Sequence, residues 1–457
     1  MKKAAVIGGG ITGLTAARHL TQSGYHTLLF EASDCCGGVV RSRRADGYLV
    51  EHGPNSFQEQ PEIMELIQSL GLMDQLVETD AGASKRFIVR NGAVVALPAS
   101  PPALLRSPAL TTRGKLRLLA EPFIRPGDPD STESLASFAK RRLGAEALNY
   151  LLDPLVSGIY AGDPAKLSAR HAFPKIHEWE QTHGSLFKGM IRSLRQRKAE
   201  GRPKPRLLSF RDGLQTLTDA LAKSLEKQTY LETKVKAITG VNGKWQVLAE
   251  RYGHELRDRY DAVILALPAP ALASLAIQTG ADDALNALTA VDHPPLRITH
   301  LGYARNALRH PLDGFGVLIP SLEERSILGA LFSSSLFPGR APADHALLTV
   351  FTGGVRHRDV ADREENEVIT QAARELEALG LVAGEPVFRQ SVFWPKAIPQ
   401  YGTKHGEFLE LFGIFEKKHP GIFIASQCRD GVSLPNCAAA GQTHAERAAR
   451  HLADLPD

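Results

Sequence analysis

The first residues able to do chemistry are the glycines of a tight turn near the start of the chain. The turn reads Gly8, Gly9, Gly10, Ile11, Thr12 and Gly13, which is a Gly-x-Gly-x-x-Gly spacing. An apolar run at 4–7 precedes it and an apolar-periodic stretch at 14–23 follows, which predicts strand, turn and helix. In such a turn the backbone can approach a pyrophosphate, and the free N–H groups of the helix N-terminus bind its negative charge. The turn therefore predicts a dinucleotide site.

A carboxylate stands where a dinucleotide site requires one. Glu31 directly follows a second predicted strand, 27–30, and lies 18 residues after Gly13. Its side chain is placed to accept hydrogen bonds from ribose hydroxyls. A glycine triplet alone is weak evidence, and a plain strand–helix turn is the alternative. The order strand, turn, helix, strand and acid favours the nucleotide site.

Two later segments extend the predicted cofactor site. Residues 37–41 read GGVVR and residues 51–56 read EHGPNS. A second glycine pair with a basic residue nearby is similar to the flavin amine-oxidase superfamily, in which these loops line the diphosphate and ring of FAD. Arg41 is then a cofactor residue, with a solvated loop charge as the alternative. The turn at 426–435 precedes a predicted helix, 435–455, whose positive N-terminal dipole would face the flavin, unless it is a simple strand–helix connection.

The elements that must position these residues have the pattern of a multidomain α/β protein. A chain of 457 residues is too long for one ordinary core, so two or three domains are expected. The predicted elements are a helix over 60–80, a hairpin over 85–97 about Asn91-Gly92, helices over 101–185, a basic surface loop at 195–206, a strand at 263–267 that returns to the nucleotide domain, a second sheet over 290–405 and a strand at 422–425.

Composition excludes several classes of function. The net charge of +4 is too small to indicate nucleic-acid binding by itself. Cys35, Cys36, Cys428 and Cys437 form no C-x-x-C pair, so we expect reduced thiols and neither a metal site nor a disulfide framework. No uncharged apolar run reaches about 18 residues, so no transmembrane helix is expected. The first predicted strand leaves no room for a signal peptide, which predicts a cytoplasmic protein.

Over nearly its whole length the chain resembles the protoporphyrinogen oxidases, which are oxygen-dependent, FAD-containing members of the same superfamily. The most specific segment is 153–164, DPLVSGIYAGDP, which is similar to a DP-x-V-x-G-x-x-x-x-DP stretch of that family. Further matching segments are 84–92, 314–320, 328–334, 337–342 and 351–354. None of them carries a cofactor motif, so they indicate this family and not flavin oxidases in general.

The resemblance implies an α/β fold with three parts. An FAD/NAD(P)-binding Rossmann-like domain would combine residues 1–84, 207–275 and 410–457. A mixed-sheet substrate domain would combine 85–100 and 276–409, and residues 101–206 would form a helical, membrane-associating domain. The resemblance also implies the reaction: FAD-dependent oxidation of protoporphyrinogen IX by dioxygen, which gives protoporphyrin IX in haem biosynthesis and hydrogen peroxide.

The resemblance assigns roles to individual residues. The positions that contact FAD in the family are occupied by Gly8, Gly9, Gly10, Ile11, Thr12, Gly13, Glu31, Ala32, Val39, Arg41, Gly53, Pro54, Asn55, Ser56, Val235, Gln427, Val432, Ser433 and Leu434. The positions that contact the substrate are Arg86, which pairs with a propionate, Gly158, which meets a pyrrole through its backbone, and Leu318, Leu331 and Phe351, which sandwich the macrocycle. By residue type alone, the last three would be core residues and Arg86 an exposed charge. No general base is implied, so positioning against the flavin and exclusion of water would carry catalysis.

The chain departs from the family at two places. Ser426-Gln427-Cys428 stands where the family often has an aromatic residue and a glycine, and Ala161 stands where several plant enzymes carry glycine. The flavin contacts and the pocket wall are therefore expected to differ in detail.

Other functions remain open from the sequence. A coproporphyrinogen III oxidase would use the same fold on a substrate with four carboxylates, and its pocket should contain more basic residues. A generic flavin amine oxidase would need an aromatic cage, for which Trp394 and Tyr401 are candidates. A flavin-binding protein without turnover is a further alternative.

The expected partners are a porphyrinogen and dioxygen, with no nucleic acid. The apolar segments 103–105, 116–119 and 123–124 have basic flanks and are candidates for peripheral contact with the cytoplasmic face of a membrane. Packing inside the helical domain is the alternative for these segments. A homodimer is a candidate assembly that the sequence leaves open.

Overall fold

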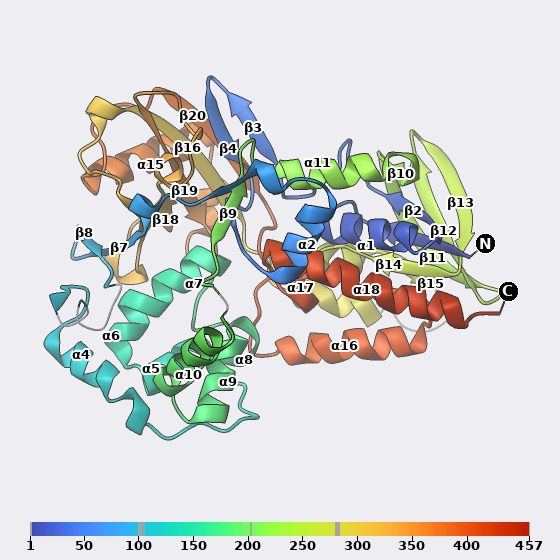
Figure 1. Ribbon diagram of the computed structural model, residues 1–457, viewed down its shortest axis with the longest axis horizontal. Helices are drawn as coiled ribbons and strands as arrows, with labels where there is room; N and C mark the ends of the chain where they lie inside the picture. The colour runs from blue at the N-terminus through green and yellow to red at the C-terminus, as the bar shows by residue number, and fades with distance from the viewer. Residues whose placement is uncertain (1, 99–102, 104–105, 202, 279–283, 457) are drawn as a thin grey trace.

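The computed structural model of the protein describes residues 2–98, 103, 106–201, 203–278 and 284–456 (Figure 1). Both termini lie at one end of the molecule, beside a parallel sheet and its helices. A mixed sheet and a group of helices lie at the other end, one above the other in this view. Within the described residues, no helix combines the length and the apolar character needed to cross a membrane.

Strands from distant parts of the chain form the parallel sheet. Its order is β10 (Thr229–Tyr230), β2 (His26–Phe30), β1 (Lys3–Ile7), β14 (Ala262–Leu265) and β21 (Ile422–Ile424), and each neighbouring pair is parallel. The predicted strands near both ends of the chain, and the return of the 263–267 segment to this sheet, are confirmed. An FAD-type Rossmann sheet is thus assembled from three separate stretches of sequence.

The two faces of the parallel sheet pack against different layers, because successive side chains of a strand point to opposite faces. Ala4 and Val6 pack with α1 (Ile11–Gln22), α11 (Gln215–Ser224) and α18 (Leu434–Asp454). Ala5 and Ile7 pack with β12 (Lys244–Arg251), α12 (Ala269–Ser274) and α16 (His405–Lys418). Strand β12 lies in a second sheet, whose order is β13 (His254–Tyr260), β12, β11 (Thr233–Val241) and β15 (Ala276–Gln278). The turn that opens α1 is therefore fixed from both sides of the sheet.

The sheet that the sequence predicts over residues 290–405 is the seven-stranded mixed sheet of the structure. Its order is β20 (Phe388–Trp394), β16 (Leu296–Ala304), β19 (His345–Gly353), β18 (Gly329–Leu331), β17 (Gly314–Leu318), β7 (Lys85–Arg90) and β8 (Ala93–Ala96). Strands β17 and β7 are parallel, whereas their neighbours pair antiparallel. Helix α15 (Glu365–Ala378) covers one face through Ile369, Ala372 and Leu376. Helix α15 does not cover the opposite face of the mixed sheet, which carries Leu318, Leu331 and Phe351.

The hairpin that opens this sheet is confirmed at its predicted turn. Asn91 and Gly92 both have positive φ angles, 51° and 75°. Two consecutive positive φ angles define the turn type whose twist matches that of paired strands. The turn therefore sets the register of β7, the strand that carries Arg86.

Short strands connect the two larger sheets. Strands β3 (Ser42–Ala45) and β4 (Tyr48–Glu51) form a ribbon, and β9 (Leu207–Phe210) lies between β5 (Phe57–Gln58) and β6 (Leu76–Glu78). Strands β3 to β6 carry the chain from β2 of the parallel sheet to β7 of the mixed sheet, and β9 carries it from the helices back towards β10. Residues 42–58 therefore sit at the junction, directly before and within the predicted cofactor loop.

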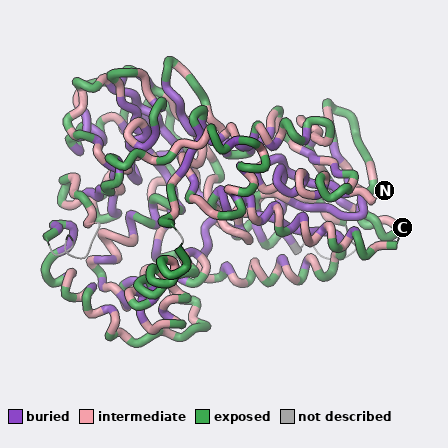
Figure 2. Tube along the Cα trace, viewed as in Figure 1, coloured by how far each residue is buried: buried purple, intermediate pink, exposed green. Residues whose placement is uncertain are grey.

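Residues 106–201 form the predicted group of helices. They are α4 (Thr112–Leu119), the turn η3 (Glu121–Phe123), α5 (Leu135–Arg142), α6 (Ala145–Ala147), a π-helical segment at Leu148–Leu152, α7 (Asp153–Tyr160), α8 (Ala169–Ala172), α9 (Pro174–His183) and α10 (Leu186–Ala199). Their apolar core includes Leu135, Phe138, Val156 and Tyr160. Helix α10 lies at the surface and most of its length is exposed (Figure 2).

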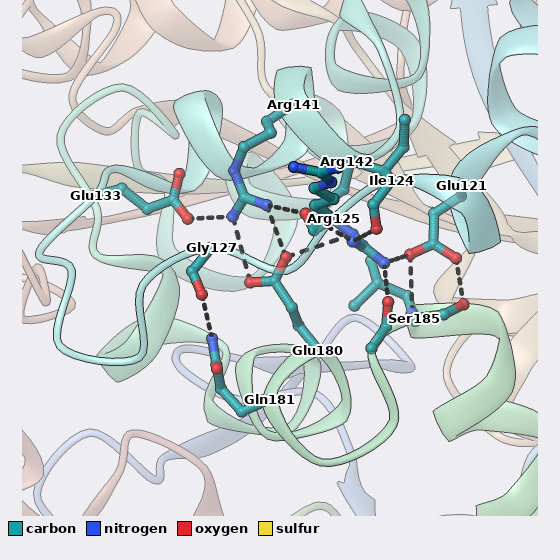
Figure 3. A network of polar contacts seen from close by, with 12 residues as sticks. Glu121, Ile124, Arg125, Gly127, Glu133, Arg141, Arg142, Glu180, Gln181 and Ser185 are labelled. Carbon is teal, nitrogen blue, oxygen red and sulfur yellow. Dashed lines mark hydrogen bonds and ion pairs between the residues drawn. The ribbon is translucent and has the colours of Figure 1, made fainter.

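A buried network of ions holds the helical group together (Figure 3). Arg142 is fully buried and pairs with Glu121, which also accepts hydrogen bonds from Ser185 Oγ at 2.6 Å and from the Leu186 N–H at 2.9 Å. Arg141 binds Glu180 at 2.7 Å and also pairs with Glu133. Removing one partner from such a buried pair costs about 3–5 kcal/mol, because a charge is left unpaired. The network therefore fixes the position of α5 relative to α9 and α10.

Two sequence predictions are wrong in their extent. The helix expected over 60–80 ends early: α2 spans Pro61–Ser69, Gly71 has a φ of 69°, and β6 follows. A glycine with positive φ ends a helix, which the apolar periodicity could not indicate. The basic loop expected at 195–206 is helical up to Ala199, since cations in the last turn of α10 complement the helix dipole. The domain boundaries stay a prediction.

Candidate functional site

Backbone contacts explain two of the three glycines in the Gly-x-Gly-x-x-Gly spacing, Gly8 and Gly13. Gly8 has a φ of 105°, and a Cβ atom there would lie 2.3 Å from the carbonyl oxygen of Ala266. A Cβ atom on Gly13 would lie 1.8 Å from the carbonyl oxygen of Gly8. Helix α1 can therefore approach β1 and β14 this closely only without side chains at these positions.

Gly10 differs from its neighbours because a Cβ atom there would meet nothing within 4 Å. It is the N-cap of α1, with ordinary angles of φ −69° and ψ 175°, and no side chain caps the helix. The first turn of α1 therefore has no side-chain cap and open space beside its N-cap residue, where the helix dipole would stabilise an anion. This is the geometry of a pyrophosphate site.

Glu31 reaches the same turn from the end of β2. One carboxylate oxygen accepts a hydrogen bond from the Gly9 N–H at 2.6 Å and the other from the Ser33 N–H at 2.8 Å. Ala32, which lies between Glu31 and Ser33 in the sequence, is exposed. The N–H of Thr233 binds the Glu31 carbonyl at 2.8 Å, which brings β11 and the half-buried Val235 towards this end of β2.

The second glycine pair lies directly on the first. The Gly37 N–H donates to the Gly9 carbonyl at 2.8 Å, and a Cβ atom on Gly38 would lie 3.4 Å from Gly10 Cα. A Cβ atom on Gly53 would lie 2.1 Å from the Val39 carbonyl oxygen, so the 37–41 and 53–56 loops are in contact. Val39 is exposed and Arg41 Nε donates to the Gly38 carbonyl at 3.1 Å.

The remaining loop residues lie on the same junction. Pro54, Asn55 and Ser56 are each half-buried between the two sheets. Asn55 Nδ2 has one weak hydrogen bond, to the Gly53 carbonyl at 3.3 Å. The side chain of Asn55 therefore keeps most of its hydrogen-bonding capacity for another group.

A second helix N-terminus lies beside the first. Ser433 caps α18 by accepting from the Asn436 N–H at 3.2 Å, and Val432 and Leu434 flank it. A Cβ atom on Gly441 of α18 would lie 2.3 Å from the Thr12 carbonyl, so α18 packs closely on α1. The carbonyl of Gln427 accepts a hydrogen bond from the Tyr401 hydroxyl. The segment 426–434 contains the short helix α17 (Gln427–Asp430), where the sequence predicted a loop.

These features fit FAD. The residues predicted to contact it come together from β1, β2, β11, the two glycine loops and α18, with Gly10 open and the first turn of α1 uncapped. The turn would hold the diphosphate, Glu31 the ribose and the N-terminus of α18 the flavin ring. Bound FAD would supply the acceptor for a hydride from a substrate held against its ring.

The residues predicted to hold the macrocycle share one face of the mixed sheet. Leu318 of β17 and Phe351 of β19 both pair with Gly329 of β18, and Leu331 follows two residues later on the same face. All three side chains are half-buried, whereas Val317, Ala330 and Val350 on the opposite face are at most 3% exposed. The three residues therefore present an apolar surface that the protein core does not fully cover.

Helix α7 packs across this apolar surface. A Cβ atom on Gly158 would lie 2.9 Å from Leu318 Cδ2, so a side chain at 158 would push Leu318 aside. The helix is anchored by Asp153, whose carboxylate accepts from Arg356 at 2.5 Å and from the Ser321 N–H at 2.8 Å. Arg356 also donates to the Ile319 carbonyl at 2.9 Å, one residue after Leu318. The ion pair thus sets the spacing between α7 and β17.

Arg86 lies at the edge of the same face. It follows the alternation of β7, in which Ile88 pairs with Leu318, and its guanidinium lies 5.5 Å above the ring of Phe315. Phe315 and Leu331 pack against the same buried cluster. Among the described residues, the guanidinium of Arg86 has no ion pair and no hydrogen bond. An exposed cation is therefore available at the rim of the apolar surface.

Sequence reasoning missed the residues that position this surface. Asp153 was part of a family segment without a role of its own, and Arg356 carried no signal, because their contact joins residues 203 positions apart. His52 was also missed: its carbonyl accepts a hydrogen bond from Trp394 Nε1 at 2.6 Å, which ties the cofactor loop to β20. Among the described residues, no group of His, Cys, Asp and Glu side chains could hold a metal ion.

Comparisons with known proteins agree with this geometry. The family model for flavin containing amine oxidoreductases matches residues 11–449. A mitochondrial protoporphyrinogen oxidase from Nicotiana tabacum is 35% identical over 99% of this chain and 95% of its own length. A coproporphyrinogen III oxidase from Staphylococcus aureus is 28% identical over 99% of this chain and 100% of its own. A crystal structure from Exiguobacterium, named provisionally as a protoporphyrinogen oxidase, superposes with a TM-score of 0.81 at 26% identity, covering 98% of this chain and 99% of that one.

The open space at Gly10 gives the sharpest test of the cofactor site. The substitution Gly10→Ala should leave the apoprotein as stable as the wild type, since its Cβ meets no protein atom and its φ is ordinary. The methyl group would occupy space next to the helix N-terminus, so FAD affinity should fall by roughly tenfold or more. Titration of apoprotein with FAD and thermal unfolding without FAD would measure the two effects.

Gly413→Ala in α16 is the matched control, because it also adds a methyl group that meets nothing within 4 Å. Its FAD affinity should equal that of the wild type. Equal FAD affinity for Gly10→Ala and the wild type would mean that the diphosphate does not lie at this turn.

Proposed function

The chain belongs to the flavin-containing amine oxidoreductase family, and on that premise we propose that it oxidises protoporphyrinogen IX to protoporphyrin IX with dioxygen. It is an FAD-dependent oxidoreductase. The observation that carries the choice of substrate is the half-buried apolar surface of Leu318, Leu331 and Phe351 with the unpaired Arg86 at its rim. A flat tetrapyrrole with carboxylates on one side matches this combination of apolar area and one rim cation.

The chain's own residues would act by positioning. The apolar side chains of the mixed sheet and the close approach of α7 at Gly158 would hold the macrocycle and exclude water from it. Arg86 would fix its orientation through a bidentate contact with a propionate. The reacting carbon of the substrate would then face the flavin. The reaction would need no side chain that acts as a base.

The pairing of nearby cations favours a substrate with few carboxylates. Arg90 shares the face of Arg86 on β7, but it pairs with Glu146 at 2.7 Å and lies 4.2 Å above the ring of Tyr150. Arg356 pairs with Asp153. A pocket for the four carboxylates of coproporphyrinogen would need more unpaired cations than Arg86, the one that β7 offers among the described residues, so coproporphyrinogen III is the second candidate.

The amine oxidase alternative is disfavoured by the positions of the candidate cage residues. Tyr401 is buried and its ring stacks on His405 at a centroid distance of 4.2 Å. Trp394 packs in a different cluster, with Ala161 and Phe351. The two aromatic side chains belong to separate groups and do not form a cage together.

The test of the function is a comparison of the two porphyrinogens. Under anaerobic conditions protoporphyrinogen IX should bleach the yellow FAD-loaded protein, and air should restore the colour. The kcat/KM for protoporphyrinogen IX should exceed that for coproporphyrinogen III by roughly tenfold or more, the effect of leaving two carboxylates without partners. Absence of bleaching by either substrate would overturn the oxidase; a higher kcat/KM for coproporphyrinogen would reverse the choice.

Arg86 provides the test of the binding mode. Because its guanidinium would contact only a propionate, Arg86→Ala should raise KM by roughly 10- to 100-fold and leave FAD binding unchanged. Arg86→Lys should recover part of the loss, because it keeps the charge but not the bidentate fork. Steady-state kinetics and the flavin absorbance of the purified variants measure both effects.

Lys85→Ala is the matched control, since Lys85 is the adjacent cation on the other face of β7 and pairs with Asp313. Its KM should stay near the wild-type value. A wild-type KM for Arg86→Ala would show that the propionates bind elsewhere.

We also propose that the helical group makes peripheral contact with an anionic membrane. Leu116 and Leu119 of α4, Phe123 of η3 and Leu194 of α10 are exposed, with Phe123 87% accessible, and η3 packs against α10. Arg113, Arg192 and Arg195 are exposed on the same two helices. An apolar patch with basic flanks suits the interface of an anionic bilayer. Leu104 and Leu105, also predicted to take part, lie outside the described residues.

Flotation with vesicles tests this proposal. The FAD-loaded protein should float with vesicles that contain phosphatidylglycerol and stay behind with neutral ones. Phe123→Ser should lower the bound fraction, because it removes the most exposed apolar side chain of the patch. Ile414→Ser, which alters an exposed side chain on α16, should bind like the wild type. Equal flotation of both variants would place the contact elsewhere.

A further inference from the structure

A small cavity with a few polar groups in its lining lies between the cofactor loop and the mixed sheet. Its volume is ≈ 10 Å³, which is room for about one water molecule. Its polar lining comes from Glu51, Asn55, Ser333, Arg340 and Thr349, and its remaining walls are apolar. The cavity therefore adjoins Asn55, whose side chain makes one weak hydrogen bond, to the Gly53 carbonyl.

Among the described residues, the lining contains a buried donor that makes no well-aligned hydrogen bond. Arg340 is 3% exposed, and its Nη1 lies 3.1 Å from Glu51 Oε1 but makes no hydrogen bond of acceptable geometry. A buried guanidinium N–H without an acceptor is strongly unfavourable. Arg340 is thus a built feature of this cavity that points to a ligand.

The two hydroxyl groups that line the cavity, those of Ser333 and Thr349, already have hydrogen-bond partners. Ser333 Oγ lies 2.8 Å from Thr349 Oγ1, which lies 3.0 Å from Nδ1 of the fully buried His300. A hydroxyl offers one donor and two acceptor sites, so Ser333 retains capacity for a further partner. Burial lowers the pKa of His300 to about 3, so this chain of groups stays uncharged at neutral pH.

Charge and size select the ligand. One arginine and one glutamate leave the lining neutral, so neither a cation nor an anion would be favoured, and the volume excludes anything much larger than water. A water molecule can accept from Arg340 and bond to Asn55 and Thr349 at the same time, since buried waters make about three hydrogen bonds.

We propose that this cavity binds one ordered water, and that Thr349 and Ser333 act through it as positioning residues for the Asn55 side chain at the flavin. The water joins the ion pair at the junction of the two sheets to the 53–56 loop. The proposal rests on the assignment of that loop to FAD, and not on the identity of the porphyrinogen. Its effect should therefore appear in FAD binding before any substrate is added.

Substitution of Thr349 tests the proposal against a control on the same strand. Thr349→Val keeps the shape of the side chain and removes the hydroxyl, whereas Thr349→Ser keeps the hydroxyl. Thr352→Val is the matched control: Thr352 is also buried on β19, but it lies on the opposite face of the sheet and its hydroxyl has no partner.

A high-resolution crystal structure of the FAD-loaded wild type should show one water within hydrogen-bond distance of Arg340 Nη1. Thr349→Val should weaken FAD binding to the apoprotein by roughly tenfold and change the visible circular dichroism of bound FAD, with Thr349→Ser close to the wild type. Thr352→Val should match the wild type in both readouts.

An empty cavity in the wild-type crystal would overturn the water site. Equal FAD affinity and flavin spectrum for Thr349→Val and the wild type, or equal losses for Thr349→Val and Thr349→Ser, would overturn the positioning role. Protoporphyrinogen turnover does not enter these readouts, so a failure here is distinct from a failure of the oxidase function.

Discussion

A buried ion pair between Glu51 of β4 and Arg340 connects the strand before the cofactor loop to the segment that leads into β19 of the mixed sheet. Both side chains are 3% exposed, and Glu51 also accepts from Ser42 Oγ at 2.6 Å and from the Leu214 N–H at 3.0 Å. Arg340 donates to Ser209 Oγ at 2.6 Å, and its carbonyl accepts from the Leu49 N–H. Taking two charges out of water is costly, so the pair is stable only because these further hydrogen bonds surround it. It fixes the mixed sheet to the start of α11 and to the strand before the cofactor loop.

That constraint explains how sites from separate sheets can cooperate. The glycine contacts fix α1 and the two cofactor loops relative to β1, while the Asp153–Arg356 pair fixes α7 relative to β17. Neither contact alone sets the distance between the flavin side and the apolar face. The Glu51–Arg340 junction contributes to it, together with the hydrogen bond from Trp394 Nε1 to the His52 carbonyl, because residues 51–56 continue directly from Glu51 into the cofactor loop. A reaction that relies on positioning needs this rigidity more than it needs a reactive side chain.

The sequence predicted the features that depend on neighbouring residues and missed those that depend on contacts between distant residues. The glycine turn, the strands around it and the Asn91-Gly92 hairpin were predictable because each depends on neighbouring residues. The end of α2 at Gly71 and the helical state of 195–199 were missed, since periodicity and charge describe a segment without its caps. For Leu318, Leu331 and Phe351, residue type indicated core, and only the strand register shows that they share a partly open face. Residue type alone could not distinguish the two faces of the sheet.

The same reasoning applies to charge near the substrate. A count of basic residues on β7 would suggest a pocket suited to several carboxylates, because Lys85, Arg86 and Arg90 lie within six residues. Pairing changes that conclusion: Asp313 pairs with Lys85 and Glu146 pairs with Arg90, so among the described residues Arg86 is the cation of β7 without an ion pair. Glu146 is itself held by the N–H and hydroxyl of Thr111, so Arg90 cannot be released without disturbing α4. Discrimination between porphyrinogens would then depend on which acidic side chains pair with the cations near the substrate. The helical group would contribute to it, because its Glu146 pairs with Arg90.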